Sequence, residues 1–488
     1  MNVSVLLKAA LTSSPGFRSD SAVQFLTSDS REVSSGALFV AISGTQSDGH
    51  SFLDAVFKAG AVAAIGEKPY THDRYIQVKD SREALARLAS AFYGHPSYQM
   101  KVLGVTGTSG KTTTTYLLES ILNAAGYQTG LLGTVSFRYG KKTFPSTHTT
   151  PGPVELQKLL REMSDAGCTA VVMEVSSHAL KQKRTLGIAF DGMAFTNLSR
   201  EHLDFHPTMD DYFDSKALLF TDYAVEAVVA GKKPFFSINR DDQYGERLFQ
   251  KTKAKQEFGF HLSDVENLQI SLQGIRGTLS GLSFESPLVG KFNVENILNA
   301  LVLARGVGIH NEAIQRGIRN LHSVPGRLDP VPEAENHGLK ILVDYAHKPD
   351  ALEKVLQILR ELKPKGTGRL ITVFGCGGDR DRTKRPVMGE IATRLSDLTI
   401  VTSDNPRTEN PMAIITEILS GIPEKAVYSV EPDRRLAIHR SIEMAQKGDL
   451  ILVAGKGHED YQILGKQKIP FDDKKIALEG LTRVFKKL

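Results

Sequence analysis

Short runs of apolar and β-branched residues recur along the chain, and segments with helical spacing separate them. The clearest runs occupy residues 37–42, 102–106, 170–175, 340–344, 370–374, 398–402 and 449–454. Turn-forming residues follow these runs, and continuous apolar runs are typical of strands buried on both faces of a parallel sheet. No repeat of about 20–50 residues and no low-complexity tract interrupts the pattern. The sequence therefore predicts an α/β fold with mostly parallel sheets.

Two breaks in this pattern indicate domain junctions. The chain has 488 residues, which is enough for about three domains. Residues 93–97 contain Gly and Pro and follow a predicted helix at 82–92, and residues 323–328 follow a predicted helix around 314–321. We therefore expect an N-terminal domain at 1–98, a central domain at 99–328 and a C-terminal domain at 329–488.

Composition narrows the class of protein. Hydrophobic residues make up 41% and charged residues 24% of the chain, as in ordinary globular proteins. The net charge of +5 is mild for this length, so we expect anionic small substrates and no nucleic acid. Cys168 and Cys376 form neither a metal motif nor a disulfide framework, which favours a reducing compartment. Without a secretory signal or a run of about 18 apolar residues, we expect a cytoplasmic protein that does not insert into membranes.

The strongest chemical signal is the loop that follows the second apolar run. Its residues are Gly107, Thr108, Ser109, Gly110, Lys111, Thr112 and Thr113. A strand, a Gly-rich loop and a helix in this order direct backbone N–H groups and a helix N-terminus at phosphate oxygens. The lysine can reach the β- and γ-phosphates, and the Thr112 hydroxyl suits Mg²⁺. The pattern departs from GxxxxGK[ST] because residue 105 is Val, yet it predicts Mg-ATP binding better than an ordinary turn with an exposed lysine.

Three further side chains, Glu174, His202 and Lys216, are candidates for a role beside this loop. Glu174 ends an apolar strand, where a carboxylate is costly unless something compensates it. In P-loop proteins a neighbouring strand commonly presents a carboxylate to the metal; the alternative is a surface carboxylate at a strand end. By spacing alone, His202 would be a structural histidine and Lys216 an ordinary helix lysine.

The order of several strings along the chain is similar to that of the Mur ligase family. The strings are TGTSGKTTTT, MEVSSHAL, FTNLSREHLDFH with a lysine 14 residues after His202, FNVENILNA, PGR and VDYAHKPD. The resemblance covers essentially the whole chain. It implies an amide-forming enzyme of cytoplasmic peptidoglycan-precursor synthesis, which is often monomeric. It also implies an N-terminal UDP-binding α/β domain, a central P-loop ATPase and a C-terminal Rossmann-like domain.

The resemblance assigns roles around the nucleotide. It implies that Thr112 and Glu174 hold one Mg²⁺, that His202 helps to hold a second, and that CO₂ carbamylates Lys216. A carbamate replaces a cation with an anionic oxygen donor, which suits Mg²⁺. The implied catalytic residues are Lys111, Glu174, His202 and Lys216, and the implied further nucleotide contacts are Asn293, Asn296, Arg327 and Asp344. Family loops usually have Asn at the position of Ser109, a change that we expect to leave ATP binding intact.

For the acyl donor, the resemblance is greatest to the tripeptide-forming branch of the family. Residues 27–31, 36–41 and 44–49 are similar to its UDP-binding region, which implies UDP-end contacts at Ser28, Ser30, Thr45, Gln46 and Ser47. The implied contacts to the muramoyl-peptide end are Thr149, Thr150, Ser176, Gln182 and Arg184. Hydroxyl and guanidinium groups suit an acidic substrate with several carbonyls. The alternative for the Ser and Thr residues is routine capping and turn hydrogen bonding.

The string SDNPRTENP at 403–411 bears on the amino acid that is added. Family members that add meso-diaminopimelate have DNPR here, and lysine-adding members lack this Arg. Arg407 can bind the distal carboxylate of diaminopimelate through two hydrogen bonds, whereas a lysine ammonium would be repelled. The implied acceptor-binding residues are Arg380, Asp404, Asn405, Pro406, Arg407, Gly455 and Glu459, with Glu459 suited to the distal amino group. Without the family, 404–407 would be a turn and 377–385 a charged surface loop.

Together these features predict ATP-dependent addition of meso-diaminopimelate to UDP-N-acetylmuramoyl-L-alanyl-D-glutamate through an acyl phosphate. The nearest alternative is the same reaction with L-lysine. Related ligases of the folylpolyglutamate or D-alanyl-D-alanine-adding type are disfavoured by DNPR and by residues 28–31. A P-loop kinase or nucleotide switch is the alternative from another class.

Overall fold

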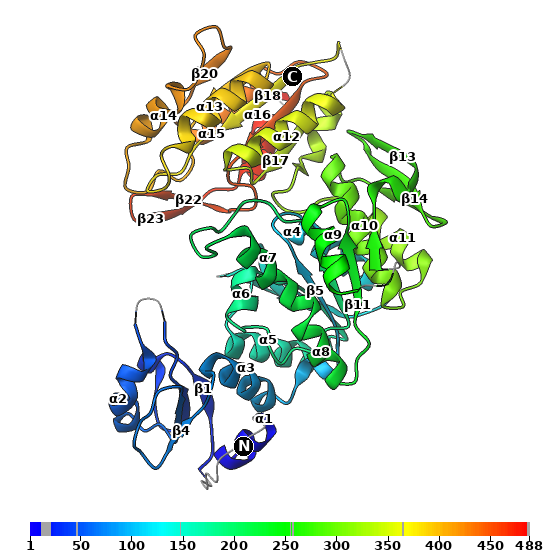
Figure 1. Cartoon of the computed structure of the whole chain (residues 1–488). Coiled ribbons are helices and arrows are strands. Elements are labelled where there is room, and N and C mark those ends of the chain that lie inside the picture. Colours follow the sequence, from blue (N-terminus) through cyan, green and yellow to red (C-terminus); the bar gives the residue numbers. More distant parts are fainter. Residues whose placement is uncertain are drawn as a thin grey trace. The chain divides into compact units, whose positions relative to one another are not determined.

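The fold consists of two compact units in the computed structural model, which describes residues 1–10, 21–44, 47–146, 148–253, 255, 258–363 and 366–485. One unit comprises Met1–Val265 and Glu295–Ile318, and the other comprises Glu266–Val294 and Arg319–Leu488. Figure 1 shows their helices and strands. Most strand pairs in the three largest sheets are parallel, so the predicted α/β class is confirmed. The boundaries at 98/99 and 328/329 stay predictions.

A four-stranded parallel sheet, in the order β1-β2-β3-β4, opens the first unit. Its strands are β1 (Phe25–Thr27), β2 (Ala37–Val40), β3 (Ala63–Gly66) and β4 (Tyr75–Gln77), and its helices are α1 (Val3–Ala10), α2 (Leu53–Lys58) and α3 (Ser81–Phe92). Alternate residues of β2 pack on opposite faces. Leu38 packs with residues of α1 and α3, while Phe39 packs with residues of α2. The continuous apolar run therefore reflects a strand covered on both sides.

The same unit holds an eight-stranded sheet in the order β12-β11-β10-β5-β9-β6-β7-β8. Its strands are β5 (Lys101–Thr106), β6 (Thr129–Leu132), β7 (Ser136–Tyr139), β8 (Lys142–Pro145), β9 (Ala170–Glu174), β10 (Gly192–Phe195), β11 (Phe235–Asn239) and β12 (Gly259–Phe260). The helices are α4 (Lys111–Ala124), α5 (Pro153–Asp165), α6 (Ser177–Lys181), α7 (Met209–Ala217), α8 (Asp222–Val229) and α9 (Gln243–Lys251), with parts of α10 (Lys291–Gly306) and α11 (Asn311–Asn320). The neighbours β10, β5, β9 and β6 are parallel. Their carboxyl ends therefore share one edge, where α/β proteins bind ligands.

The second unit contains a six-stranded sheet in the order β16-β17-β21-β18-β19-β20, parallel except for β16. Its strands are β16 (Asp329–Pro330), β17 (Lys340–Asp344), β18 (Leu370–Phe374), β19 (Leu398–Val401), β20 (Tyr428–Val430) and β21 (Leu450–Ala454). The helices are α12 (Pro349–Leu362), α13 (Lys384–Leu395), α14 (Pro411–Leu419), α15 (Arg434–Glu443) and α16 (Asp473–Phe485). Two small sheets comprise β13 (Val265–Ser271), β14 (Gly274–Leu279) and β15 (Leu282–Ser286), and β22 (Tyr461–Leu464) and β23 (Gln467–Pro470).

Two apolar layers enclose this six-stranded sheet. Phe374 of β18 belongs to the layer formed with α12, α13 and α14. Val373, the preceding residue, belongs to the layer formed with α15 and α16. Alternation along each strand thus anchors helices on both faces, and the loops after β18, β19 and β21 are left at the carboxyl edge.

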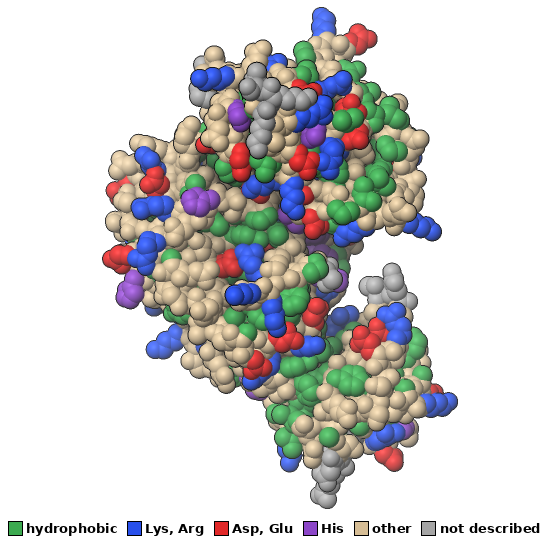
Figure 2. All heavy atoms as spheres, turned by 180° about the vertical axis from the view of Figure 1, so that it is seen from behind, with side chains coloured by type: hydrophobic (Ala, Val, Ile, Leu, Met, Phe, Trp, Pro, Cys, Tyr) green, Lys and Arg blue, Asp and Glu red, His purple; other side chains and the backbone are tan. Residues whose placement is uncertain are grey.

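The surface mixes charges of both signs. On the face in Figure 2, Lys and Arg side chains lie interspersed with Asp and Glu side chains, in keeping with the small net charge. Within the described residues, none of the helices has the length and apolar character that crossing a bilayer requires. The expected cytoplasmic location and monomeric state stay predictions.

Candidate active site

The loop between β5 and α4 has the backbone expected of a phosphate-binding loop. Gly107 and Gly110 have φ angles of +145° and +85°, which residues with a Cβ rarely adopt. α4 begins at Lys111 without a side-chain hydrogen bond to its cap. Its first N–H groups, together with the helix dipole, therefore favour an anion. The predicted order of strand, glycine loop and helix is confirmed.

Gly110 gives a test of this loop that separates its backbone strain from its steric fit. A Cβ at Gly110 would lie 2.3 Å from Asn296 Oδ1, whereas one at Gly126, with a similar φ of +89°, would meet nothing within 4 Å. We expect both Gly→Ala changes to cost about 1–2 kcal/mol of stability. Only Gly110→Ala should also weaken ATP binding, by roughly tenfold or more, because the loop must shift. Calorimetric titration with ATP and thermal unfolding of both variants measure this, and equal ATP affinities would contradict it.

Polar contacts hold the loop against the segment after β10. Thr196 Oγ1 donates to Ser109 O at 2.6 Å, and Ser109 N donates to Asn197 Oδ1 at 3.0 Å. Lys111 Nζ donates to the carbonyl oxygens of Gly107 and Thr108 at 2.9 and 2.8 Å. Thr196 and Asn197 were not predicted, although their position just after a buried strand beside β5 could have indicated them.

Glu174 lies buried beside the start of α4. Its Oε1 accepts hydrogen bonds from Thr112 Oγ1 at 3.0 Å and from Thr134 N at 2.9 Å, and its Oε2 accepts one from Thr134 Oγ1 at 3.0 Å. The structure thus brings together the two side chains predicted to hold the first Mg²⁺. Thr134, after β6, was not predicted.

Hydroxyl and carboxylate oxygens are donors of the kind that Mg²⁺ prefers, and nucleotide phosphates commonly complete such sites. Within the described ranges, no group of three or more His, Cys, Asp and Glu side chains is placed to hold a metal ion. The predicted set fits a magnesium site of the phosphate-dependent kind, because it combines one carboxylate with a hydroxyl. Its role stays a prediction.

Lys216 is buried against the same loop, which its sequence context did not indicate. It lies on α7, is 1% exposed, and its Nζ donates to Gly107 O at 2.8 Å. Burial, with a smaller contribution from the positive charge of Lys111, lowers the pKa of Lys216 well below its usual value. The neutral amine is therefore favoured far more than in an exposed lysine.

Tyr212 connects Lys216 with His202. Its ring lies 4.7 Å from Lys216 Nζ and 6.0 Å from the His202 ring, and its hydroxyl is 3.1 Å from Thr108 Oγ1. His202 has a φ of +57°, a strained backbone typical of functional positions. His202, Lys216 and the loop are thus neighbours, although ligation by His202 stays a prediction.

Two other histidines of this region are structural neighbours of His202. His178 stacks on Phe205 and lies 5.0 Å from His202 between ring centroids. Burial, then the charges of His202 and His206, lower the pKa of His178 to about 4. His206 is fully buried between Asp211 and Ser177. At neutral pH the neutral form of His178 is therefore favoured.

The residues predicted for the muramoyl-peptide end form one connected network with Glu174. Thr150 Oγ1 donates to Glu174 O at 2.9 Å and accepts from Ser176 N at 3.1 Å. Arg184 Nη1 donates to Thr150 O at 3.1 Å, and its Nε and Nη2 donate to Gln182 Oε1 at 3.0 and 2.7 Å. Thr149 joins through Thr134, with their hydroxyl oxygens 3.1 Å apart.

Lys183, between Gln182 and Arg184, fixes this loop to α3. Its Nζ lies 2.8 Å from Asp80 Oδ2 and 2.7 Å from Glu83 Oε2, and its φ is +55°. Two carboxylates at the N-terminal end of α3, on the cap residue Asp80 and on Glu83, therefore hold a loop of the eight-stranded sheet.

The residues predicted for the UDP end are placed only in part. Ser28 follows β1 and is exposed, Ser30 is half-buried, and Ser47 is exposed and accepts from Gly44 N through its carbonyl at 3.0 Å. Thr45 and Gln46 lie outside the described residues. The described residues lie in the segments that follow β1 and β2. Their contact with UDP stays a prediction.

The remaining nucleotide-contact predictions fall in both units. In the first, Thr114 Oγ1 donates to Asn296 Oδ1 at 3.4 Å, which places Asn296 beside α4. In the second, Asn293 Nδ2 donates to Val289 O at 2.7 Å. Asp344 ends β17 and accepts from Leu328 N and Ala346 N. Its burial raises its carboxyl pKa, which the charge of Arg327 partly opposes.

The predicted acceptor residues come together at the carboxyl edge of the six-stranded sheet. Arg380 follows β18, residues 404–407 follow β19, and Gly455 and Glu459 follow β21, three neighbouring strands. Asn405 Nδ2 donates to Glu459 Oε2 at 2.8 Å. The buried Lys456, which was not predicted, lies 3.1 Å from the same carboxylate oxygen.

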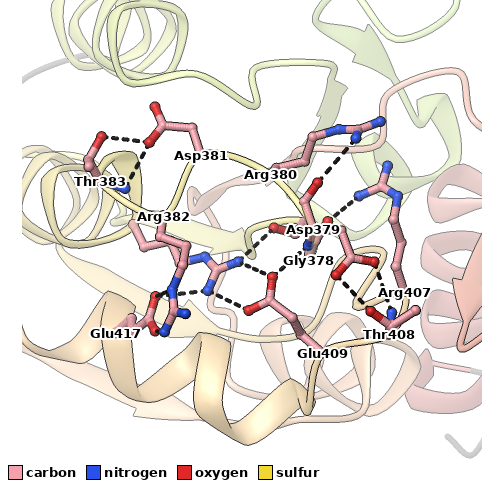
Figure 3. Close-up of polar contacts among 12 residues, drawn as sticks. Gly378, Asp379, Arg380, Asp381, Arg382, Thr383, Arg407, Thr408, Glu409 and Glu417 are labelled. Atoms are coloured by element: carbon pink, nitrogen blue, oxygen red, sulfur yellow. Dashed lines mark hydrogen bonds and ion pairs between the residues drawn. The ribbon is translucent and has the colours of Figure 1, made fainter.

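Arg407 faces the loop after β18, as Figure 3 shows. Its Nη1 donates to Gly378 O at 2.7 Å, and its backbone has a φ of +52°. Arg380 Nη1 donates to Asp379 O at 3.1 Å. Among the described residues, neither guanidinium has a carboxylate partner. Their charge is therefore available to an anion.

Comparisons with known proteins agree along the length of the chain. Three family models match: "Mur ligase family, catalytic domain" at residues 22–93, "Mur ligase middle domain" at 105–304 and "Mur ligase, glutamate ligase domain" at 326–457.

Individual proteins match over almost the whole chain. The chain is 47% identical to the UDP-N-acetylmuramoyl-L-alanyl-D-glutamate–2,6-diaminopimelate ligase of Geobacter metallireducens, with 93% of each chain covered. It is 45% identical to the ligase of the same name from Thermosynechococcus vestitus, with 99% of this chain and 98% of that one covered. A solved structure of a ligase of this name matches with a TM-score of 0.70 and 31% identity, covering 94% of this chain and 95% of that one.

Proposed function

The chain belongs to the Mur ligase family, and we propose that it joins meso-2,6-diaminopimelate to UDP-N-acetylmuramoyl-L-alanyl-D-glutamate at the expense of ATP, in peptidoglycan-precursor synthesis. The proposal is supported by two sets of contacts made by Glu174, one through its side chain and one through its backbone. Its carboxylate contacts Thr112 of the nucleotide loop, and its backbone carbonyl contacts Thr150 of the network that reaches Arg184. One residue thus adjoins both the phosphate end and the acyl-donor end.

The reaction proceeds in two transfers. An oxygen of the D-glutamyl side-chain carboxylate attacks the γ-phosphorus of ATP, the bond to the β-phosphate oxygen breaks, and ADP leaves from an acyl phosphate. The amine of diaminopimelate then attacks the acyl carbon, loses a proton, and expels phosphate from the tetrahedral intermediate. Lys111 and the N–H groups of α4 offset the negative charge that accumulates when carboxylate and triphosphate approach.

Magnesium ions fit the residues present. Thr112 and Glu174 would hold one ion, and His202 with the carbamate of Lys216 would hold a second. Bound Mg²⁺ supplies positive charge that screens the phosphate oxygens. The low pKa of Lys216 supports carbamylation, because CO₂ adds to the neutral amine and releases a proton.

The acceptor end is assigned to Arg407 and Arg380. Both guanidiniums contact only backbone carbonyl oxygens among the described residues, so the distal carboxylate of diaminopimelate can bind them with charge-assisted hydrogen bonds. L-Lysine lacks that carboxylate, which disfavours it as acceptor.

The test supplies ATP, the UDP-dipeptide and either meso-diaminopimelate or L-lysine, and measures ADP, phosphate and the UDP-tripeptide by mass spectrometry. We expect phosphate release to require both the dipeptide and diaminopimelate. Labelled oxygen in the glutamyl carboxylate should appear in phosphate, as the acyl phosphate demands. Phosphate release that ignores both substrates would instead indicate a kinase or switch, and equal turnover of lysine would overturn the acceptor assignment.

A further inference from the structure

Four arginines lie at the carboxyl edge of the six-stranded sheet, where the predicted acceptor residues come together. They differ in whether a carboxylate neutralises their charge. Arg382 pairs with Glu417, and Arg385 pairs with both Glu409 and Glu417. Arg380, in the loop after β18, and Arg407, in the loop after β19, have only backbone oxygens as partners within the described part of the chain. Figure 3 shows these loops facing each other. Charge neutralisation is therefore confined to one side of the cluster.

Arg385, near the start of α13, is the centre of the neutralised side. The residue is fully buried. Its Nη1 and Nη2 donate to Glu409 Oε2 and Oε1 at 2.9 and 2.8 Å, which is a two-pronged ion pair. Nη1 also donates to Glu417 Oε2 at 2.8 Å, and Nη2 to Gly377 O at 3.2 Å. Such paired geometry fixes a carboxylate in direction as well as in place.

Hydrogen bonds also join the loop after β18 to the loop after β19. Asp379 N donates to Glu409 Oε1 at 2.5 Å, and the Asp379 carboxylate accepts from Thr408 N and Oγ1 at 3.1 and 2.8 Å. Gly378 N donates to Asn405 O at 2.9 Å. A Cβ at Gly378 would lie 1.9 Å from Pro406 O, so the approach requires glycine. The loops are held too closely to separate without breaking several bonds.

Glu409 is an acidic residue on the same loop as Arg407. It lies two residues further along the same loop. Arg385 lowers the pKa of Glu409 to about 2, helped by the Asp379 N–H, so the carboxylate is ionised at neutral pH. A carboxylate released from Arg385 would be attracted to the nearest free guanidinium, and would then compete with a carboxylate of the substrate.

We propose that Arg385 is a positioning residue of the acceptor subsite, which holds the Glu409 carboxylate away from Arg407 and Arg380 so that these guanidiniums stay available to a carboxylate of the incoming amino acid. The inference rests on the proposed function, since it needs an anionic acceptor.

The test compares Arg385→Met, Glu409→Gln and the double variant in the full-length protein, with the KM of each substrate and kcat measured separately. We expect Arg385→Met to raise the diaminopimelate KM roughly tenfold or more, with the ATP and UDP-dipeptide KM values little changed. The double variant should recover most of this loss, because the competing charge is gone. Glu409→Gln alone should change the KM by less than about threefold.

The outcomes separate the possible roles. A double variant as impaired as Arg385→Met, or worse, would overturn the proposal, because it would show that the charge of Glu409 is not what weakens diaminopimelate binding. So would an Arg385→Met variant with unchanged KM. If wild type does not use diaminopimelate, the proposed function itself fails, and that result is seen before any variant is made.

Folding is monitored by thermal unfolding, since Arg385→Met removes the shared partner of Glu409 and Glu417. If that variant does not fold, Arg385→Lys serves, because it keeps the charge and loses the two-pronged geometry. Its diaminopimelate KM should rise severalfold and fall again when Glu409→Gln is added. No fall would overturn the proposal.

Discussion

Replacing Lys216 with methionine is expected to lower kcat by roughly a hundred- to a thousandfold. The lysine is buried and bonded to Gly107 O, and methionine fills similar space but cannot accept CO₂. The site would lose the anionic oxygens that the proposed carbamate would supply. Lys216→Arg should be equally impaired, because a guanidinium stays charged and is not carbamylated. Lys251→Met, at an exposed lysine paired with Asp214, is the matched control and should keep wild-type activity.

If Lys216 is carbamylated, enzyme activity is expected to depend on CO₂ and on pH. Because burial lowers the pKa of Lys216, the neutral amine is favoured more at neutral pH than it is in an exposed lysine. As pH falls through the lowered pKa, the amine gains a proton and the carbamate is lost, so activity should fall on the acid side. Isotopically labelled bicarbonate should give a carbamate NMR signal in wild type that Lys216→Met lacks. Full activity of wild type in CO₂-free buffer would contradict the assignment.

Replacing Arg407 with methionine is expected to raise the diaminopimelate KM by roughly 30- to 150-fold, which corresponds to about 2–3 kcal/mol for lost charge-assisted hydrogen bonds. The ATP KM should stay near that of wild type. Arg394→Met, at a surface arginine paired with Glu390 and Glu353, is the matched control. Steady-state assays with varied diaminopimelate measure the effect, and an unchanged acceptor KM would remove Arg407 from the subsite.

Local chemistry explains which parts of the site the sequence could predict. Gly107 and Gly110 come directly after β5, and Glu174 is the last residue of β9. Residue type and spacing along the chain therefore predict both. The burial of Lys216 could not be predicted in this way, because Asp210, Asp211 and Asp214 precede it on α7 and make the helix look solvent-exposed. Its environment is set by Gly107 and Tyr212, and the first of these lies far away in the sequence.

Contacts between segments far apart in the sequence explain why Thr134 and Arg385 were not predicted. Thr134 bonds Glu174 across 40 residues, and Arg385 bonds Glu409 across 24 residues. Neither partner has a local motif, and Arg385 lay in what looked, without the family, like a charged surface loop. Strand order is the missing information, because it decides which loops meet at an edge. For the UDP end, the residues are placed but their contacts to substrate stay predictions.

The separation between the apolar layers and the loops of the six-stranded sheet has an evolutionary consequence. The layers with α12, α13, α14 and with α15, α16 form the apolar core of this unit, whereas the proposed acceptor residues lie on loops beyond the strand ends. Codon changes in such loops leave the buried layers unaltered. Substitutions in these loops can therefore change the amino acid that the proposed site accepts while the apolar layers stay the same.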